Sequence, residues 1–514
     1  MNKKIYLSDQ YIVSAYENGN SLDAPVYISL LSDGTENNIK LPQNIYNEYD
    51  GLGQGTRTCK TYFTAFEFKE RAAVNITLPK DIKSITVKPE HILSEYQFEN
   101  GVFSFETEKT VSFVIEPDGD IFGGLHVFGS KFKQVIRDKK NIIEFSQGIY
   151  TSDNCRYIRI NEHGVPVIDH IKDDTLIYIS GGAVVNAAIE LAGVKNVTIT
   201  GTGIISLIDR CHGAENNFAD ERMWGAFRYH AKPNIYIRSG CTNIEIEDVI
   251  LSCEFRGIVI RNSEALAIKN VKMFTSTENA DGINCYNTSR LVVDGCYIQS
   301  ADDCFCMYNA CDSIPMLFDT DYHPVKAVCR GVEVKNCVMS SNARPVVLGG
   351  HATGAKEPRC IIEDIYIHDC SIIETPYRIF GNTAEYSMYW SGFLRLLSQS
   401  EQLVRNIRFE NIKVDVTAGH NGKPVHIEVR DGKNASYTEC RGYRIEGVSF
   451  KNISIRGCTD RLMPSLIKGR APLDEEDDCG VFDVTFENVT IDGALVEEQQ
   501  ILCEGNVYYV KIKQ

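Results

Sequence analysis

Alternating apolar and polar residues recur in one short pattern along most of the chain. Each copy reads apolar, any, apolar, any, then Asn, Asp or Gly, and most copies end on a further apolar residue or Cys, as in Ile244–Val249. Strict alternation is the periodicity of a strand with one buried face, and Asn, Asp and Gly tolerate the left-handed backbone of a tight corner. The pattern therefore predicts nine strands that each end at a corner, beginning at Val197, Ile244, Leu266, Leu291, Val332, Ile365, Ile407, Val448 and Val484.

The spacing of these copies predicts how the strands stack. From Asp248 to Asn270 and from Asn270 to Gly295 the corner residues lie 22 and 25 residues apart, roughly one coil of a parallel β-helix. Longer gaps are then loops inserted into a coil. Most copies have no amphipathic helix of crossover length between them, which disfavours a barrel or a doubly wound sheet, and separate β-sandwiches would not repeat one pattern nine times. We therefore expect an all-β chain in which residues 141–514 form a right-handed parallel β-helix.

The first 140 residues lack this pattern and contain short apolar strands instead. These strands cover residues 65–68, 73–78, 84–87 and 111–115, and turn residues such as Pro117-Asp118-Gly119 separate them. We expect residues 1–140 to form a small antiparallel β-sandwich packed on the N-terminal end of the β-helix, where it would cover an open sheet edge.

Composition excludes several classes of partner. The formal net charge of −16 argues against nucleic acid, because phosphate binding needs clustered Lys and Arg. It also weighs mildly against a strongly anionic substrate, unless a local basic pocket overrides the average. No apolar run approaches the length that spans a bilayer, so we expect no membrane partner. Asp9 interrupts the N-terminal segment before an apolar stretch develops, so we expect no secretory signal and a cytoplasmic location.

The 18 cysteines fit the repeat better than they fit disulfides or a metal site. Cys296, Cys337 and Cys370 occupy the same slot in three copies, which predicts small side chains stacked inside the β-helix. No pair has Cys-x-x-Cys spacing, and no Cys/His cluster of the zinc type occurs. We expect reduced cysteines, no metal and no cofactor.

Three aspartates recur at the spacing of one coil. Asn279-Ala280-Asp281 is followed 21 residues later by Asp302 and Asp303, within Ser300-Ala301-Asp302-Asp303. Adjacent coils lie about 4.8 Å apart, and crowded carboxylates raise the pKa of at least one of them. A protonated and an ionised carboxyl on one surface are what hydrolysis of a glycosidic bond needs. The bland alternative is that these aspartates make only corner hydrogen bonds.

The segment from Asp281 to Cys304 resembles the polygalacturonase family of glycoside hydrolases, family 28. The pattern of that family is Asn-Thr-Asp, then Gly-Asp/Gln-Asp-Asp, then Gly-His-Gly, then Arg-Ile-Lys. This chain matches the first element at Asn279 and Asp281 and the second at both aspartates; Gly349–Ala352 resembles the third and Arg378–Phe380 the fourth. The resemblance implies a right-handed parallel β-helix that acts with inversion.

The resemblance also implies a role for each matching residue. Asp302 would be the general acid, and Asp281 and Asp303 would position the attacking water. His351 would support the proton balance of the acid or contact the sugar. Phe380 stands where the family has Lys, so Arg378 alone would grip a substrate carboxylate.

The substrate therefore stays open between two sugars. One is a pectin-type galacturonide or related plant glycan. The other is a neutral α-glucan, because a β-sandwich ahead of a β-helix is similar to the layout of the dextranase and isopullulanase family.

Residues around the aspartates are candidates for binding sugar. Arg256 and Arg344 follow strands on nearby coils and would either bind substrate or neutralise the acidic cluster. Long insertions supply aromatic rings that would stack on sugars or merely bury the loops, namely Trp224, Tyr308, Tyr389 and Trp390. Such loops favour a pocket closed at one end and exo-action on short oligosaccharides.

Two rival functions share the fold. A polysaccharide lyase would need a uronate and a basic catalytic residue, which is not found among the three aspartates. A non-catalytic carbohydrate-binding solenoid would tolerate replacement of Asp302. We expect a hydrolase of oligo- or polysaccharides and leave the oligomeric state open.

Overall fold

The computed structural model describes most of the chain. The described residues are 7–36, 56–121, 123–162, 164–207, 233–253, 255–276, 280–309, 327–341, 343–350, 360–374, 392–399, 401–416, 422–433, 439–457 and 462–513. Strands dominate these ranges, with one short 3-10 helix, η3 (Glu498–Gln500). No helix within them is long and apolar enough to cross a membrane.

The first ten strands form two five-stranded sheets. Pairings are antiparallel except that β10 runs parallel to β4. One sheet contains β1 (Ile12–Glu17), β2 (Asn20–Leu22), β5 (Ala72–Thr77), β7 (Tyr96–Glu99) and β8 (Val102–Thr107). The other contains β3 (Val26–Glu36), β4 (Thr56–Phe68), β6 (Ile85–Lys88), β9 (Val111–Pro117) and β10 (Leu125–Lys131).

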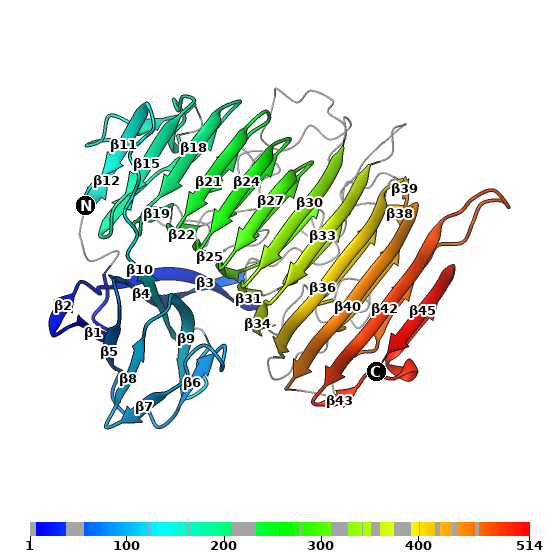
Figure 1. Cartoon of the computed structure of the whole chain (residues 1–514), viewed down its shortest axis with the longest axis horizontal. Coiled ribbons are helices and arrows are strands. Elements are labelled where there is room, and N and C mark those ends of the chain that lie inside the picture. The colour runs from blue at the N-terminus through cyan, green and yellow to red at the C-terminus, as the bar shows by residue number, and fades with distance from the viewer. Residues whose placement is uncertain are drawn as a thin grey trace.

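From Asn141 onward the chain winds into a parallel β-helix, as the repeat predicted (Figure 1). A large sheet has 21 described strands, and a second sheet has 12. A typical coil supplies two strands to the large sheet and one to the second. A small two-stranded sheet, β38 (Asp431–Lys433) and β39 (Glu439–Arg441), lies outside both.

The large sheet is made of β11 (Asn141–Phe145), β12 (Gly148–Tyr150), β15 (Thr175–Ile179), β16 (Ala183–Val185), β18 (Lys195–Thr200), β19 (Ile204–Ser206), β21 (Thr242–Glu247), β22 (Ile250–Cys253), β24 (Glu264–Lys269), β25 (Lys272–Thr275), β27 (Ser289–Asp294), β28 (Tyr297–Ser300), β30 (Val328–Lys335), β31 (Val338–Ser341), β33 (Ile361–His368), β34 (Ser371–Glu374), β36 (Leu403–Asp415), β40 (Arg444–Arg456), β42 (Gly480–Ile491), β43 (Ala494–Leu495) and β45 (Val507–Lys513). The second sheet is made of β13 (Arg159–Ile160), β14 (Pro166–Ile168), β17 (Ala188–Leu191), β20 (Ile235–Ile237), β23 (Ile258–Arg261), β26 (Ile283–Tyr286), β29 (Phe305–Tyr308), β32 (Val346–Gly349), β35 (Leu394–Ser398), β37 (Val425–Val429), β41 (Ser465–Lys468) and β44 (Ile501–Glu504).

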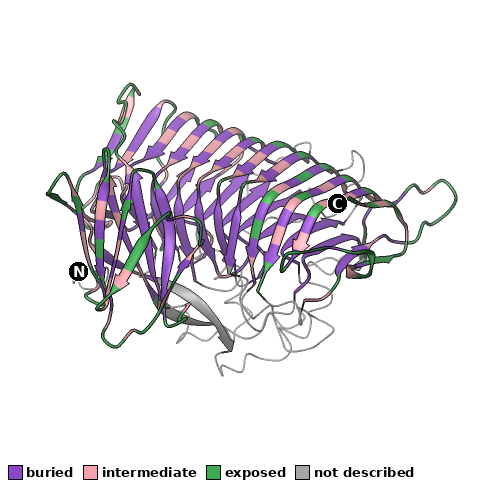
Figure 2. Cartoon of the chain, turned by 60° about the horizontal axis from the view of Figure 1, so that its bottom comes forward, coloured by how far each residue is buried: buried purple, intermediate pink, exposed green. Residues whose placement is uncertain are grey.

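All nine predicted strands are confirmed, and they stack in register within the large sheet. The first apolar residue of each copy pairs with that of the next, from Val197 to Val484. Their inward residues, such as Ile244 and Ile246, join one continuous apolar core. Figure 2 shows this buried interior, with partly exposed positions alternating along the outer faces. The period-two pattern therefore fixes which side chains enter the core.

The corner residues adopt the left-handed backbone that their identities predicted. Asn411 has φ 54° and Asn452 has φ 53°. Their side chains also bond from coil to coil: Asn411 Nδ2 donates to Asp369 Oδ1 at 2.9 Å, and Asn452 Nδ2 donates to Asn411 Oδ1 at 3.0 Å. The cysteine prediction is confirmed as well, since Cys296, Cys337 and Cys370 are free thiols stacked in the core.

The N-terminal sheets pack along a flank of the coils, from β16 to β34, whereas the sequence analysis placed them at the N-terminal end. Phe63 and Phe128 share an apolar cluster with Phe274 and Tyr297 of the β-helix. These β-helix rings lie on strands of the large sheet and would otherwise face water, so covering them stabilises the flank.

Candidate active site

Four charged residues line one corner of the β-helix on four consecutive coils. Arg256, Asp281, Asp303 and Arg344 each lie two residues before strands β23, β26, β29 and β32, whose first residues pair in register. Backbone hydrogen bonds continue this alignment into the corner: the amide of Gly282 donates to the carbonyl of Asp303 at 2.8 Å. The two aspartates therefore occupy equivalent positions of adjacent coils, as their spacing predicted, with an arginine on either side.

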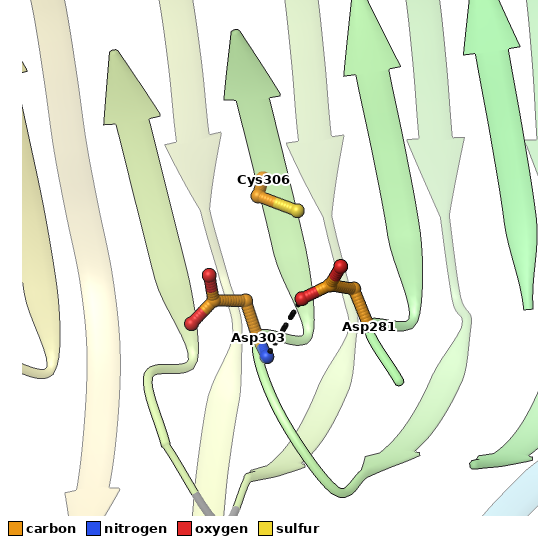
Figure 3. Close-up of side chains that lie close together, drawn as sticks. All are labelled: Asp281, Asp303 and Cys306. Atoms are coloured by element: carbon orange, nitrogen blue, oxygen red, sulfur yellow. Dashed lines mark hydrogen bonds between the residues drawn. The ribbon is translucent and has the colours of Figure 1, made fainter. Parts of the chain in front are cut away.

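Asp281 is held by three donors. The backbone amide of Asp303 donates to Asp281 Oδ1 at 3.3 Å (Figure 3). The side-chain amide of Asn284 donates to Oδ2 at 2.8 Å, and Arg256 Nε lies 3.0 Å from the same oxygen. Burial raises the pKa of Asp281 to about 6, although the Arg256 charge opposes that effect. Asp281 is therefore mostly ionised at neutral pH.

Asp303 is bound in a two-pronged ion pair. Arg344 Nε donates to Asp303 Oδ1 at 2.7 Å, and Arg344 Nη2 donates to Oδ2 at 3.0 Å. The hydroxyl of Tyr308 donates to Oδ2 at 3.2 Å. Paired N–H donors on one carboxylate are a strong and directional interaction, so this side chain has one fixed orientation.

Asp302 differs from its two neighbours. It is 5% exposed, and its Oδ1 has no hydrogen-bond partner within the described part of the chain. The nearest cation is Arg344, whose Nη2 lies 3.6 Å from Oδ1. Burial, followed by the charges of Asp303 and Asp281, raises the pKa of Asp302 well above its ordinary value. The surroundings of Asp302 therefore favour its protonated form more strongly than those of Asp281 favour the protonated form there.

The site also contains one group of possible metal ligands, Asp281, Asp303 and Cys306, whose donor atoms lie within 4.8 Å of one another (Figure 3). Burial raises the pKa of Cys306 well above that of a free thiol, and its Sγ donates to Asn284 Oδ1 at 2.7 Å. A thiol binds metal as its thiolate, and both carboxylates already face arginines. The donor set fits acid–base chemistry better than metal binding.

The outward face of the second sheet continues the site along the strands. Residues of one register row include Asn284, Cys306, Val347 and Arg395. The next row includes Arg261, Tyr286 and Tyr308. The rings of Tyr286 and Tyr308 lie 5.5 Å apart. Tyr308, a candidate for stacking on sugar, packs on Tyr286 and donates its hydroxyl to Asp303.

The sequence analysis missed Arg261 and Arg395. Both are almost fully buried, at 3% and 1% exposure. Arg261 ends the otherwise apolar strand β23, and Arg395 lies among leucines in β35. An arginine in such a strand was the available signal, because arginine is seldom fully buried.

The remaining predicted site residues lie outside the described residues and stay predictions: Asn279, Trp224, His351, Arg378, Tyr389 and Trp390. Arg344 precedes strand β32, whereas Gly350, the residue before His351, follows it. Arg344 is therefore the residue that continues the row of Asp281 and Asp303.

The segment that carries this geometry matches a known family. Residues 177–320 match the family described as Glycosyl hydrolases family 28, and this range contains all three aspartates. Over this segment the chain is similar to the polygalacturonase-type glycoside hydrolases. No curated protein sequence matches it.

Several solved structures are similar to this chain. Dex49A from Penicillium minioluteum is 14% identical with a TM-score of 0.52, and the alignment covers 98% of this chain and 94% of that one. The family 28 exopolygalacturonase of Yersinia enterocolitica is 12% identical with a TM-score of 0.42, over 86% of this chain and 96% of that one. An exopolygalacturonase from Thermotoga maritima is 13% identical with a TM-score of 0.41, over 72% and 79%. At these identities the likeness concerns the fold alone.

Proposed function

We propose that this hydrolase cleaves a pectin-type galacturonide with inversion, using Asp302 as general acid and Asp281 with Asp303 to activate water. The observation that carries the proposal is the contrast between neighbouring carboxyls: the pKa of Asp302 is raised well above its ordinary value, whereas that of Asp281 is raised only to about 6. Asp302 gives its proton to the leaving oxygen, and an ionised carboxylate draws a proton from the attacking water.

Cationic side chains around the aspartates support an acidic sugar. Arg261 and Arg395 lie on the same outward face as the Arg256 and Arg344 ion pairs. The net charge of −16 is an average over the whole chain and does not describe this face. Guanidinium groups match the carboxylate of a uronide in shape and charge.

A substrate screen tests the proposal. Purified protein is incubated with trigalacturonate, polygalacturonate and a neutral α-glucan oligosaccharide, and new reducing ends are counted. We expect activity on the galacturonides and a rate at least about a hundredfold lower for Asp302→Asn, since proton transfer to the leaving group is lost. Asp153→Asn, the same change at an exposed corner, is the matched control and should keep full activity.

Other products distinguish the alternatives. Activity confined to the α-glucan would show that the substrate is neutral and not a uronide, and the proposal of a hydrolase would be kept. Release of the β- or α-anomer, followed by NMR during the first turnovers, decides between inversion and retention. Random internal cuts in polygalacturonate would exclude exo-action.

A further inference from the structure

Arg261 lies on the outward face of the second sheet, on the N-terminal side of the aspartates. It ends strand β23, on the coil that carries Arg256, one coil before Asp281 and two coils before Asp303. Each coil advances about 4.8 Å along the axis. A saccharide whose scissile bond lies at Asp302 and Asp303 would therefore present a neighbouring unit, not the reacting one, to Arg261.

Two donor nitrogens of the Arg261 guanidinium are buried without an acceptor among the described residues. The residue is 3% exposed, and neither Nε nor Nη1 has a hydrogen-bond partner among the residues that the structure describes. By contrast, Arg238 reaches Glu190 at 2.8 Å, and Arg256 and Arg344 reach aspartates. A buried cation without acceptors destabilises the folded chain, so its presence needs another explanation.

Two tyrosine rings lie close to this cation. The guanidinium carbon lies 5.5 Å from the ring centre of Tyr236 and 5.4 Å from that of Tyr286. Ring faces stabilise the charge but supply no acceptor in the guanidinium plane. Tyr286 also contacts Tyr308, which donates to Asp303, so a continuous strip of side chains joins Arg261 to the aspartates.

We propose that Arg261 is a specificity-determining residue that binds the carboxylate of a uronic acid unit next to the one at the cleavage point. The inference rests on the proposed function and deepens it, because it assigns a second acidic group to the substrate. A carboxylate would accept hydrogen bonds in the guanidinium plane, and the two tyrosine rings would remain beside the cation. A neutral sugar would leave the buried charge without a counterion.

Calorimetric binding to the inactive Asp302→Asn protein tests this directly. The probes are trigalacturonate and its fully methyl-esterified form. Adding Arg261→Met should weaken trigalacturonate binding by about tenfold to a hundredfold, the loss expected for hydrogen bonds to a charged group, and should change binding of the ester by less than about twofold. Arg290→Met, which removes an exposed arginine of the large sheet, should change neither.

Thermal unfolding of the ligand-free variants excludes a structural role. Met fills much of the volume of the Arg stem and removes the buried charge, so Arg261→Met should unfold at the same or a higher temperature than its parent. A lower unfolding temperature, with equal weakening of both probes, would mean that Arg261 only supports the fold, and would overturn the inference.

The inference and the proposed function can fail separately. If the wild type hydrolyses trigalacturonate but Arg261→Met binds it unchanged, the subsite is wrong and the hydrolase stands. If Arg261→Met binds selectively less well but the wild type cleaves no galacturonide, the subsite stands and the reaction is wrong. No binding of trigalacturonate to Asp302→Asn overturns the subsite.

Discussion

At the scale of single residues, the aspartates of the site differ in how far their surroundings shift the pKa. Asp281 faces Arg256 across 3.0 Å, whereas Asp302 is buried and has only Arg344 at 3.6 Å. Differences in these surroundings shift the pKa values of chemically identical side chains by different amounts. The sequence was sufficient to predict that the aspartates cluster, because a period of one coil separates them. It was not sufficient to predict which one keeps its proton, since that depends on burial and on contacts across coils.

Replacing Arg256 should move the pH profile of the enzyme. The Arg256 charge lowers the pKa of Asp281, which burial raises to about 6. Asp281 must be ionised to draw a proton from water, so activity is lost as the pH falls through its pKa. In Arg256→Met this pKa is higher, and the acidic limb of kcat/KM should shift upward by roughly one to three pH units. An acidic limb that stays in place would show that Asp281 is not the group that titrates.

At the scale of elements, the period-two pattern predicted the strands and the corner residues predicted the turns. Both depend on local rules, so they hold in every copy. Arg261 and Arg395 were missed because only the pairing between strands places them on the same face as the aspartates. A long insertion separates Asp303 from Arg344 in the sequence. Their spacing is therefore longer than one coil and does not indicate that the two residues share a row.

The asparagine ladder should contribute measurably to stability. Asn411→Ala removes hydrogen bonds to Asp369 and Asn452 and forces alanine into φ 54°. We expect a loss of about 1 to 2 kcal/mol in unfolding free energy, read as a lower thermal midpoint. Asn411→Gly relieves the backbone strain and should lose less. Equal effects of the two substitutions would argue against a left-handed corner.

At the scale of the whole molecule, the N-terminal sheets cover a flank of the β-helix through a buried polar contact as well as through aromatic rings. His126 Nδ1 lies 2.7 Å from the hydroxyl of Tyr297, and its Nε2 lies 3.1 Å from Thr61 Oγ1. Burial lowers the pKa of His126 to about 3, so the ring stays neutral. This flank could not be predicted from local sequence patterns, because its apolar residues are spaced one coil apart.

Removing the Tyr297 hydroxyl should loosen this interface. Tyr297→Phe leaves a buried ring nitrogen of His126 without its partner, which costs about 1 to 3 kcal/mol. The thermal midpoint should fall, and amides of β10 should exchange with solvent faster than in the wild type. Tyr96→Phe, at an exposed ring of the same region, is the control. An unchanged midpoint would show that the aromatic cluster alone holds the two parts together.

The protonation of Asp302 is the most direct test of the account, because it needs no substrate. An infrared difference spectrum between the wild type and Asp302→Asn at pH 7 isolates the carboxyl that the substitution removes. We predict the loss of a protonated carboxylic acid band, since burial and the adjacent aspartates raise the pKa of Asp302 well above its ordinary value. Loss of carboxylate bands alone would contradict Asp302 as the general acid.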